Sequence, residues 1–401
     1  MITDSSFLGE VTMGYDLEQE RQRAVQRFTQ GQNPDAICAS FGRSRSWLYK
    51  WVARAASGDP DWFRELSREP HRQPLRTPAE VEAIVTAVRR HLDHDDLFCG
   101  PQAILWELEE MGIRPLVSIS TIERILRRHS LTKRRGRGYA PKGKAYPALP
   151  AQQPNQTHQA DLVGPRYLRG PVRFYSFNAV DLRTSRCGLE PLPSQSGQNV
   201  VDGLWALWKR LGIPWNLQVD NAWCFYGSPA HPRGMGPLIR LCLHHQVELW
   251  FIPVNEPWRN GVIEKFNDHY EQKFLRKVVM ASAEELRQAS RDFEQKHNSR
   301  YRYRKLGGQT PLQALAQAKP TLRFPEQEQA PSLPLAKPEE GCYHLVRFIR
   351  SDLRLNVFGE LFAMPPQVQQ EYVVATIDVK EQKLKVFLDR QQVEEYDYKV
   401  R

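Results

Sequence analysis

The spacing of apolar residues changes twice along the chain and predicts three kinds of region. Up to about residue 132, apolar positions recur every three or four residues, which is typical of amphipathic helices. From about residue 155 they alternate with polar positions in short runs separated by helical spacing, which predicts strands and helices in turn. After a proline-rich stretch at 319–341, only the alternating pattern remains. We therefore expect a multidomain chain with an all-α start, a central α/β part and a C-terminal set of strands.

A helix-turn-helix pattern lies within the first helical region, 1–60. Cys38 precedes Gly42 by four residues, and apolar Leu48 and Trp51 follow it by six and nine. A small residue lets the two helices approach, the glycine permits a tight turn, and the later apolar residues pack the second helix inward. Ser44 can cap that helix. The remaining positions predict a DNA-binding surface, with a purely structural helical hairpin as the alternative; they are Arg43, Arg45, Ser46, Tyr49 and Lys50.

A second helical unit is expected at 78–132, and it also resembles a helix-turn-helix unit. Its last helix opens with a capping box formed by Ser120 and Glu123. The outward cations of that helix predict either DNA contacts or a solvated basic face; they are Arg124, Arg127 and Arg128. The linker that follows, 133–150, begins with six cations and no acids, which indicates an extended segment that follows DNA phosphates. Its predicted contacts are Lys133, Arg134, Arg135, Arg137, Lys142 and Lys144.

The region 151–318 predicts a mixed five-stranded sheet flanked by helices. Three successive strands come first, at about 156–163, 172–182 and 187–192, followed by a helix at 198–211. A strand at 215–220, a helix at 237–245, a strand at 247–253 and a helix from about 260 to 279 complete the pattern. This order matches the ribonuclease H-like fold. The alternating segments at 342–401 predict a small β-barrel.

Composition narrows the class of partner. The formal net charge is +10 and the isoelectric point about 9.3, which indicates a polyanionic partner such as nucleic acid. The six cysteines form no Cys-X-X-Cys pair, so neither a zinc knuckle nor a disulfide framework is indicated. The first residues do not resemble a signal peptide, and no apolar stretch reaches the length of a membrane span. We expect a protein of the bacterial cytosol or nucleoid.

Three acidic residues stand in well-marked contexts. Asp161 and Asp220 close apolar stretches that predict strands, and Glu264 lies one turn into a predicted helix. Carboxylates at the ends of separate elements can converge and hold two divalent cations, which is a site for cutting and joining phosphodiesters. Asp181 lies on the second strand outside such a context, so a structural role is expected for it. We also expect a structural role for His158; the alternative is that it lines the site.

The segment Pro257–Asn267, with Asn260-Gly261 shortly before Glu264, resembles the catalytic core of bacterial insertion-sequence transposases in the retroviral integrase superfamily. The resemblance covers roughly 79–315. It implies that Asp161 bridges two Mg²⁺ ions, that Asp220 and Glu264 each hold one, and that Mn²⁺ can substitute. Arg259, Asn260 and Lys265 are predicted to contact DNA.

The sequence departs from the family's pattern at two places. Ala222 follows Asn221 where relatives usually have glycine, and 43 residues separate Asp220 from Glu264. The excess length is expected in an active-site loop at 226–236.

The expected function is a transposase that cuts the ends of a mobile element and joins the 3′-hydroxyls to target DNA. Its partners would be double-stranded DNA, both the element ends and the target, and further copies of itself. The sequence leaves an AAA+ partner undecided. Two alternatives are a sequence-specific DNA-binding regulator with an inactive core and a nuclease that cuts without joining. The amino-acid sequence does not indicate which DNA sequence ends the element or which target is preferred.

Overall fold

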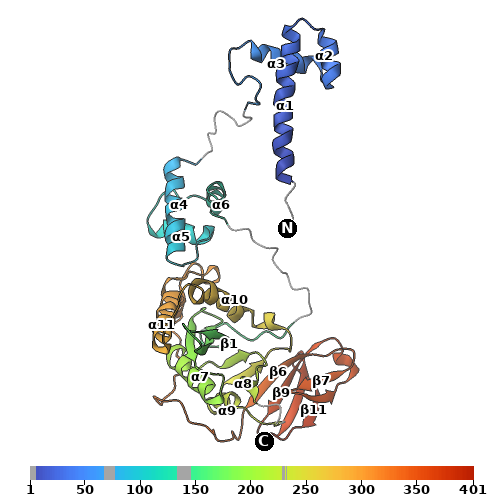
Figure 1. Cartoon of the computed structure of the whole chain (residues 1–401). Helices are drawn as coiled ribbons and strands as arrows, with labels where there is room; N and C mark the ends of the chain where they lie inside the picture. Colours follow the sequence, from blue (N-terminus) through green and yellow to red (C-terminus); the bar gives the residue numbers. More distant parts are fainter. Residues whose placement is uncertain (1–5, 67–76, 133–145, 228–230, 232) are drawn as a thin grey trace. The chain divides into compact units, whose positions relative to one another are not determined.

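The chain forms two compact units, 1–76 and 77–401, in a computed structural model. The structure describes residues 6–66, 77–132, 146–227, 231 and 233–401, with side chains from residue 17 onward (Figure 1). The six predicted linker contacts from Lys133 to Lys144 therefore lie outside the described residues. No helix in the described part of the chain is long and apolar enough to cross a bilayer.

The first unit contains the helix-turn-helix expected from the sequence. Gly42 adopts a left-handed conformation at φ 60° between the second and third helices, and the Ser44 hydroxyl accepts a hydrogen bond from the Trp47 amide. Leu48 and Trp51 are buried, as their spacing predicted. The helices are α1 (Ser6–Thr29), α2 (Pro34–Phe41) and α3 (Arg45–Ala55).

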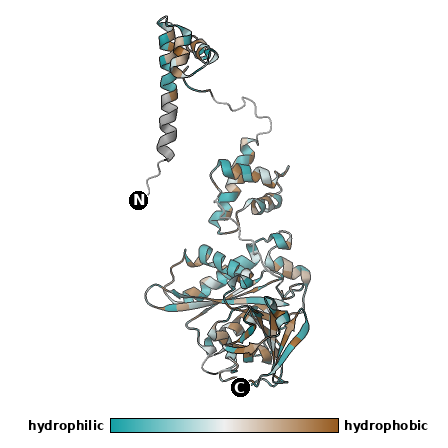
Figure 2. Ribbon diagram, turned by 90° about the vertical axis from the view of Figure 1, so that its right-hand side faces the viewer, coloured by the Kyte–Doolittle hydropathy of each residue, from teal (hydrophilic) through white to brown (hydrophobic). Residues whose placement is uncertain are grey.

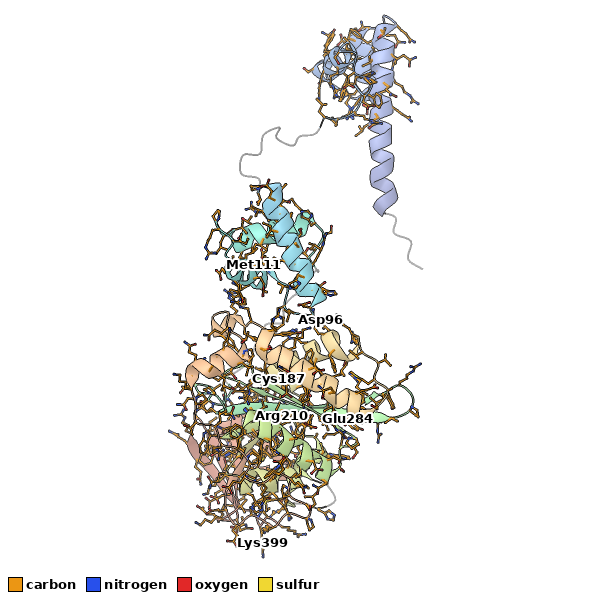
Figure 3. All side chains as sticks on the ribbon, turned by 90° about the vertical axis from the view of Figure 1, so that its left-hand side faces the viewer. Asp96, Met111, Cys187, Arg210, Glu284 and Lys399 are labelled. Atoms are coloured by element: carbon orange, nitrogen blue, oxygen red, sulfur yellow. The ribbon has the colours of Figure 1, made fainter. Side chains whose placement is uncertain are left out.

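The second unit opens with three helices, α4 (Ala79–His94), α5 (Pro101–Glu110) and α6 (Ile119–Arg128). The capping residue of α6 is Ser118, whose hydroxyl accepts from the Thr121 amide, so the capping box expected at Ser120 is wrong by one half-turn. These helices share an apolar cluster with Tyr301 of the core, and the Tyr301 hydroxyl donates to the carbonyl of Asp96, 2.6 Å away. Asp96 is labelled in Figure 3 at this junction.

The centre of the second unit is a mixed sheet in the order β3-β2-β1-β4-β5, continued by β6-β9-β10-β11. The first three strands are antiparallel to one another, as expected, and β4 and β5 join in parallel. The elements of the core are β1 (Thr157–Tyr167), β2 (Arg173–Asp181), β3 (Cys187–Leu192), α7 (Gly197–Leu211), β4 (Asn216–Val219), α8 (Trp223–Tyr226), α9 (Pro237–His244), β5 (Glu248–Phe251), η1 (Pro257–Asn260), α10 (Gly261–Tyr270), η2 (Glu271–Leu275), α11 (Ala283–Arg300), η3 (Arg304–Leu306) and α12 (Pro311–Ala318).

Both faces of this sheet are covered because apolar residues point to alternate sides of each strand. On β2, Phe177 and Ala179 belong to one apolar cluster with α7 and α9, whereas Phe174 and Val180 belong to another with α10 and α11. Brown hydrophobic segments concentrate around the strands in Figure 2, while the outer helices are largely teal. Burial on two faces fixes the register between β2 and β1, and β1 carries the first acid, Asp161.

The C-terminal strands extend the core sheet, which therefore has nine strands where five were expected. The first of them, β6, pairs in parallel with β5 and antiparallel with β9. The core strands and the strands that follow the 319–341 linker therefore form one continuous sheet. A separate small β-barrel is not confirmed, because only β7 and β8 form a sheet of their own. These elements are β6 (Cys342–Phe348), β7 (Arg354–Val357), β8 (Glu360–Ala363), η4 (Pro366–Val368), β9 (Tyr372–Asp378), β10 (Lys383–Leu388) and β11 (Gln391–Asp397).

Candidate active site

Strand pairing places Asp161 beside Asp220. The parallel strands β1 and β4 pair Gln159 with Gln218, and each aspartate lies two residues further along its own strand. Two residues is one full repeat of a strand, so both carboxylates point to the same side, on chains about 5 Å apart. Asp220 follows the end of β4, as expected, whereas Asp161 lies in the middle of β1 because that strand continues to Tyr167.

The two glutamines hold the start of the helix that carries Glu264. The Gln159 side-chain oxygen accepts from the amides of Val262 and Ile263, at 3.0 and 3.1 Å, and so caps the first turn of α10. The Gln218 amide donates to the carbonyl of Arg259 at 2.9 Å. Sequence analysis did not assign these roles. The available signal was the Gln-X-Asp triplet, which occurs at both acids.

Asp161 is the most strongly perturbed of the three acids. Burial, the Asp220 carboxylate and the Glu264 carboxylate together raise its pKa to about 6, against hydrogen bonds that lower it. Those bonds come from the Leu162 amide at 2.8 Å and the Asn267 side chain at 2.7 Å. Asn267 is itself oriented by Asn178, which donates to it at 2.8 Å. The charges of the Asp220 and Glu264 carboxylates therefore both act on Asp161.

The other two acids are half-buried. Burial raises the pKa of Asp220, and its carboxylate accepts from the Ala222 amide at 3.0 Å. Burial and the Asp268 carboxylate raise the pKa of Glu264. Within the described ranges, no three side chains of ligand type are close enough to form a ready-made metal site. Oxygen donors of this kind suit Mg²⁺, which keeps several water ligands and does not require a closed protein cage.

The C-terminal strands support the loop after Asp220. Arg347 of β6 is buried, and its guanidinium donates to the Asn221 side chain at 2.8 Å and to the Ile252 carbonyl at 3.0 Å. Asn221 also donates to the Ile252 carbonyl at 2.7 Å. Burial lowers the pKa of Arg347 to about 10, which leaves it charged at neutral pH. The residue next to the second acid is thus anchored by a strand more than 120 positions away.

The same strands hold the segment before Glu264. Arg259 pairs with Glu256 at 2.9 Å, and its guanidinium donates to the Tyr372 hydroxyl at 2.8 Å. Asn260 is buried and donates to the Ala160 carbonyl at 3.1 Å. Both side chains were predicted to contact DNA, but here their polar atoms bind the protein itself. The structure gives Arg259 and Asn260 internal contacts because η1 is folded against the sheet.

The described residues of the 226–236 loop form contacts at the base of the loop and on the C-terminal strands. The Gly236 amide donates to the Tyr226 carbonyl at 3.0 Å and closes the base of the loop. Arg233 pairs with Glu360 of β8 and lies over the Tyr398 ring at 4.6 Å. Of the loop expected at the active site, Arg233 is therefore docked on the C-terminal strands.

Asp181 and His158 have structural surroundings. Asp181 is buried and accepts from the amides of Asn155, Arg183 and Thr184, which fits the structural role expected for it. His158 is buried on the face of β1 opposite to Asp161, and burial lowers its pKa to about 4.

The predicted DNA contacts outside the core are mostly exposed, with several paired to acids. Just before α3, Arg43 pairs with Glu20, and in α3 Arg45 pairs with Asp35, whereas Ser46, Tyr49 and Lys50 are exposed. In α6, Arg128 pairs with Glu82, and Arg124 and Arg127 face solvent. On α10, Lys265 is exposed beside Asp268 at 3.6 Å.

Two family models match the sequence. Residues 15–63 match the homeodomain-like domain, which corresponds to the helix-turn-helix of the first unit. Residues 245–311 match the integrase core domain, a stretch that includes β5, α10 and Glu264. Together these matches support a transposase- or integrase-type function on DNA.

Similar solved structures include retroviral integrases. The HTLV-2 integrase catalytic core domain in complex with magnesium is 15% identical, covers 41% of this chain and 99% of its own, and gives a TM-score of 0.33. A chain of the simian T-cell lymphotropic virus intasome is 13% identical over 72% of this chain and 88% of its own, with a TM-score of 0.34. The catalytic core domain of BIV integrase is 17% identical over 41% and 96%, at 0.30. Residues 15–63 are thus similar to a homeodomain-like domain and residues 245–311 to an integrase core domain, and these two family matches support a transposase or integrase.

Proposed function

We propose that this chain cuts the ends of a mobile DNA element and joins the released 3′-hydroxyls to target DNA, with Asp161, Asp220 and Glu264 as catalytic acids. One observation carries the proposal. Two adjacent Gln-X-Asp segments hold the start of α10 between them, and the charges of Asp220 after β4 and Glu264 on α10 both raise the pKa of Asp161 on β1. A purely structural site would not gather three like charges, because each raises the free energy of ionising the others.

The carboxylates suit two Mg²⁺ ions, with Mn²⁺ as a substitute. Asp161, Asp220 and Glu264 would hold the ions, because the charges of Asp220 and Glu264 both reach Asp161. When bound, such ions stabilise the attacking and leaving oxygens of an in-line phosphoryl displacement. The protein contributes orientation: Asn267 holds one oxygen of Asp161, and Gln159 fixes the helix that carries Glu264.

DNA recognition is assigned to the helical parts. The exposed residues of α3 and α6 would read or grip the ends of the element, and the basic stretch 133–144 would follow phosphates between them and the core. Because two ends must be cut and joined together, the working form would be an oligomer of this chain on DNA. We make no assignment of an AAA+ partner.

The direct test is strand transfer on oligonucleotides that carry the element's own ends, with Mg²⁺ or Mn²⁺ present. Wild-type protein should join ends, while D161N, D220N and E264Q should lose at least about a thousandfold in rate, since each removes a ligand charge. The matched control is D202N, which replaces an exposed acid on α7 and should keep activity. Equal, metal-independent background in all variants would overturn the enzymatic proposal.

A second candidate is a DNA-binding regulator with an inactive core. It is favoured by Ala222, which follows Asn221 where relatives usually have glycine, and by the 43 residues that separate Asp220 from Glu264. In that case the wild type would bind element-end DNA tightly in the strand-transfer reaction yet produce neither cut nor joined strands. Product that is cut but never joined would instead identify a nuclease.

A further inference from the structure

The hairpin formed by β1 and β2 projects beyond the rest of the core sheet. β1 pairs with β4 only at Thr157–Gln159 but stays paired with β2 as far as Tyr167. The register shifts between Val163 and Arg166, which is a bulge that bends the strand. The projecting end is nevertheless anchored, because Leu168 is buried in the cluster beneath α10 and α11.

Backbone hydrogen bonds also fix the tip. The Leu168 amide donates to the Val172 carbonyl at 2.9 Å and closes the turn, and the Arg169 amide donates to the Met280 carbonyl at 2.8 Å. The tip therefore lies against the stretch that joins η2 to α11. The hairpin presents exposed residues on two faces, because Arg166 pairs with Phe174 on the α10 side, whereas Tyr167 and Arg173 pair with each other on the opposite side. We call the exposed residues of the hairpin and of the stretch after η2 the hairpin patch; it consists of Arg166, Tyr167, Arg169, Val172, Arg173, Arg276, Lys277 and Val279.

The hairpin patch carries an excess of positive charge. Glu271 pairs with both Arg166 and Arg276, and Lys277 pairs with Asp96. Arg169 and Arg173 are exposed and have no ion pair with any described residue. The acids that open α11 are already used, since Glu285 accepts from the Ala281 amide and Glu284 pairs with Arg287. The Arg173 guanidinium lies over the Tyr175 ring at 5.7 Å, but no acid among the described residues neutralises it or Arg169, so both can bind a polyanion.

Large apolar side chains accompany these cations. Tyr167 is 64% exposed, Val172 55% and Val279 78%. Arginine beside an exposed aromatic ring suits the backbone of DNA, where guanidinium groups bind phosphates and apolar groups contact sugars. A surface of the same kind on a second copy of this chain would repel it, because both would be positive.

The position of the hairpin patch relates it to the candidate active site. Arg166 binds Glu271, which lies two helical turns beyond Glu264, so the hairpin runs beside the helix that carries the third acid. At about 3.3 Å per residue, Tyr167 lies up to about 20 Å from Asp161 along β1. That distance corresponds to about six base pairs at 3.4 Å each. A duplex with a phosphate at the acids can therefore reach the patch.

We propose that the β1–β2 hairpin is a DNA-binding arm in which Arg169 and Arg173 contact phosphates of a duplex about six base pairs from the acidic site. This inference rests on the proposed function for the position of the DNA, but its measurement is binding rather than joining. Tyr167 is the cross-strand partner of Arg173 and would contact the same DNA backbone.

The test uses the full-length protein with R169Q and R173Q combined. On a labelled element-end duplex at physiological ionic strength, affinity should fall roughly tenfold, and the slope of log affinity against log salt should fall by about two. A charge-matched control combines K380Q and K399Q, two exposed lysines that lie in the turn after β9 and after the end of β11, and should change neither quantity. Backbone footprinting should lose protection about six base pairs from the joined phosphate.

The outcomes separate this proposal from the catalytic one. D161N should bind DNA like the wild type with full footprint, so loss of joining alone leaves the hairpin proposal intact. Unchanged affinity and salt slope in the hairpin variant would overturn it. Unchanged DNA binding with a shift in sedimentation of the free protein would assign the surface to a protein partner, which also overturns it.

Discussion

Replacing Arg347 tests whether the C-terminal strands hold the candidate active site in place. In R347A, the side-chain oxygen of Asn221 and the carbonyl of Asn356 lose their donor inside the protein, while the Ile252 carbonyl keeps Asn221. An unsatisfied buried acceptor costs about 1–3 kcal/mol, which applies to the half-buried Asn221 side chain, whereas water can reach the exposed Asn356. The lost packing of the buried Arg347 side chain adds to this cost. Removing a buried guanidinium recovers part of that sum, because its charge no longer has to be desolvated. We expect a net loss of about 3 kcal/mol.

The expected change in melting temperature follows from size. The second unit spans about 325 residues, 77–401, for which the unfolding entropy is about 0.7 kcal/mol/K. A loss of about 3 kcal/mol therefore lowers the melting temperature of this unit by about 4 °C. R347K should give an intermediate value, since an ammonium group cannot reach the same set of acceptors.

The assay is thermal unfolding of the second unit together with strand transfer at a temperature where all variants are folded. R350A, an exposed arginine three residues further on, is the matched control and should melt within 1 °C of the wild type, as about zero loss is expected at such a site. A double-mutant cycle of R347A with N221A should give a coupling energy of at least about 1 kcal/mol. Independent, additive effects, or a melting temperature equal to that of R350A, would refute the role assigned to this contact.

Three further predictions concern other contacts of the second unit. Q159L removes the acceptor for two amides of α10 and should lower the free energy of unfolding in denaturant by about 2 kcal/mol. It should reduce strand joining more than it reduces DNA binding, and equal losses of both would contradict this role of Gln159. His297 is buried with a pKa lowered to about 4, so the folded state binds fewer protons than the unfolded state, and stability falls as pH drops from about 6.5 towards 4, by up to about 3 kcal/mol. H297F should flatten that part of the pH profile, and an unchanged slope would count against this cause. G308A places a methyl group 2.7 Å from the Trp106 ring and should speed hydrogen exchange in α5, whereas G307A, with open space at its Cβ position, should not.

The central sheet could be predicted because each strand carries its own information. Residues on β2 alternate between two apolar clusters, and this period of two is visible in the sequence. The acids were found from local context, with Asp220 directly after a strand and Glu264 behind Asn260-Gly261. Their catalytic assignment stays a proposal.

Long-range pairing could not be predicted in the same way. The alternation in β6 is equally compatible with a barrel strand and with a strand that extends the core sheet, and only its pairing with β5 decides between them. The partners of Arg347 and Tyr372 depend on that choice, so neither could be assigned a role at the site. The start of α6 at Ser118 rather than Ser120 is a smaller error, because serine is a good cap at both positions.

The pairing of β6 with β5 has a consequence for shortened forms of the protein. A product that ended within 319–341 would leave β5 as a bare sheet edge and expose the apolar residues that Leu345 and Ile377 cover. We expect such a product to aggregate rather than to act as a weaker enzyme. The first unit forms its own apolar cluster without the rest of the chain, so an early stop codon beyond it could still yield a folded DNA-binding fragment that competes with the whole protein for the same ends.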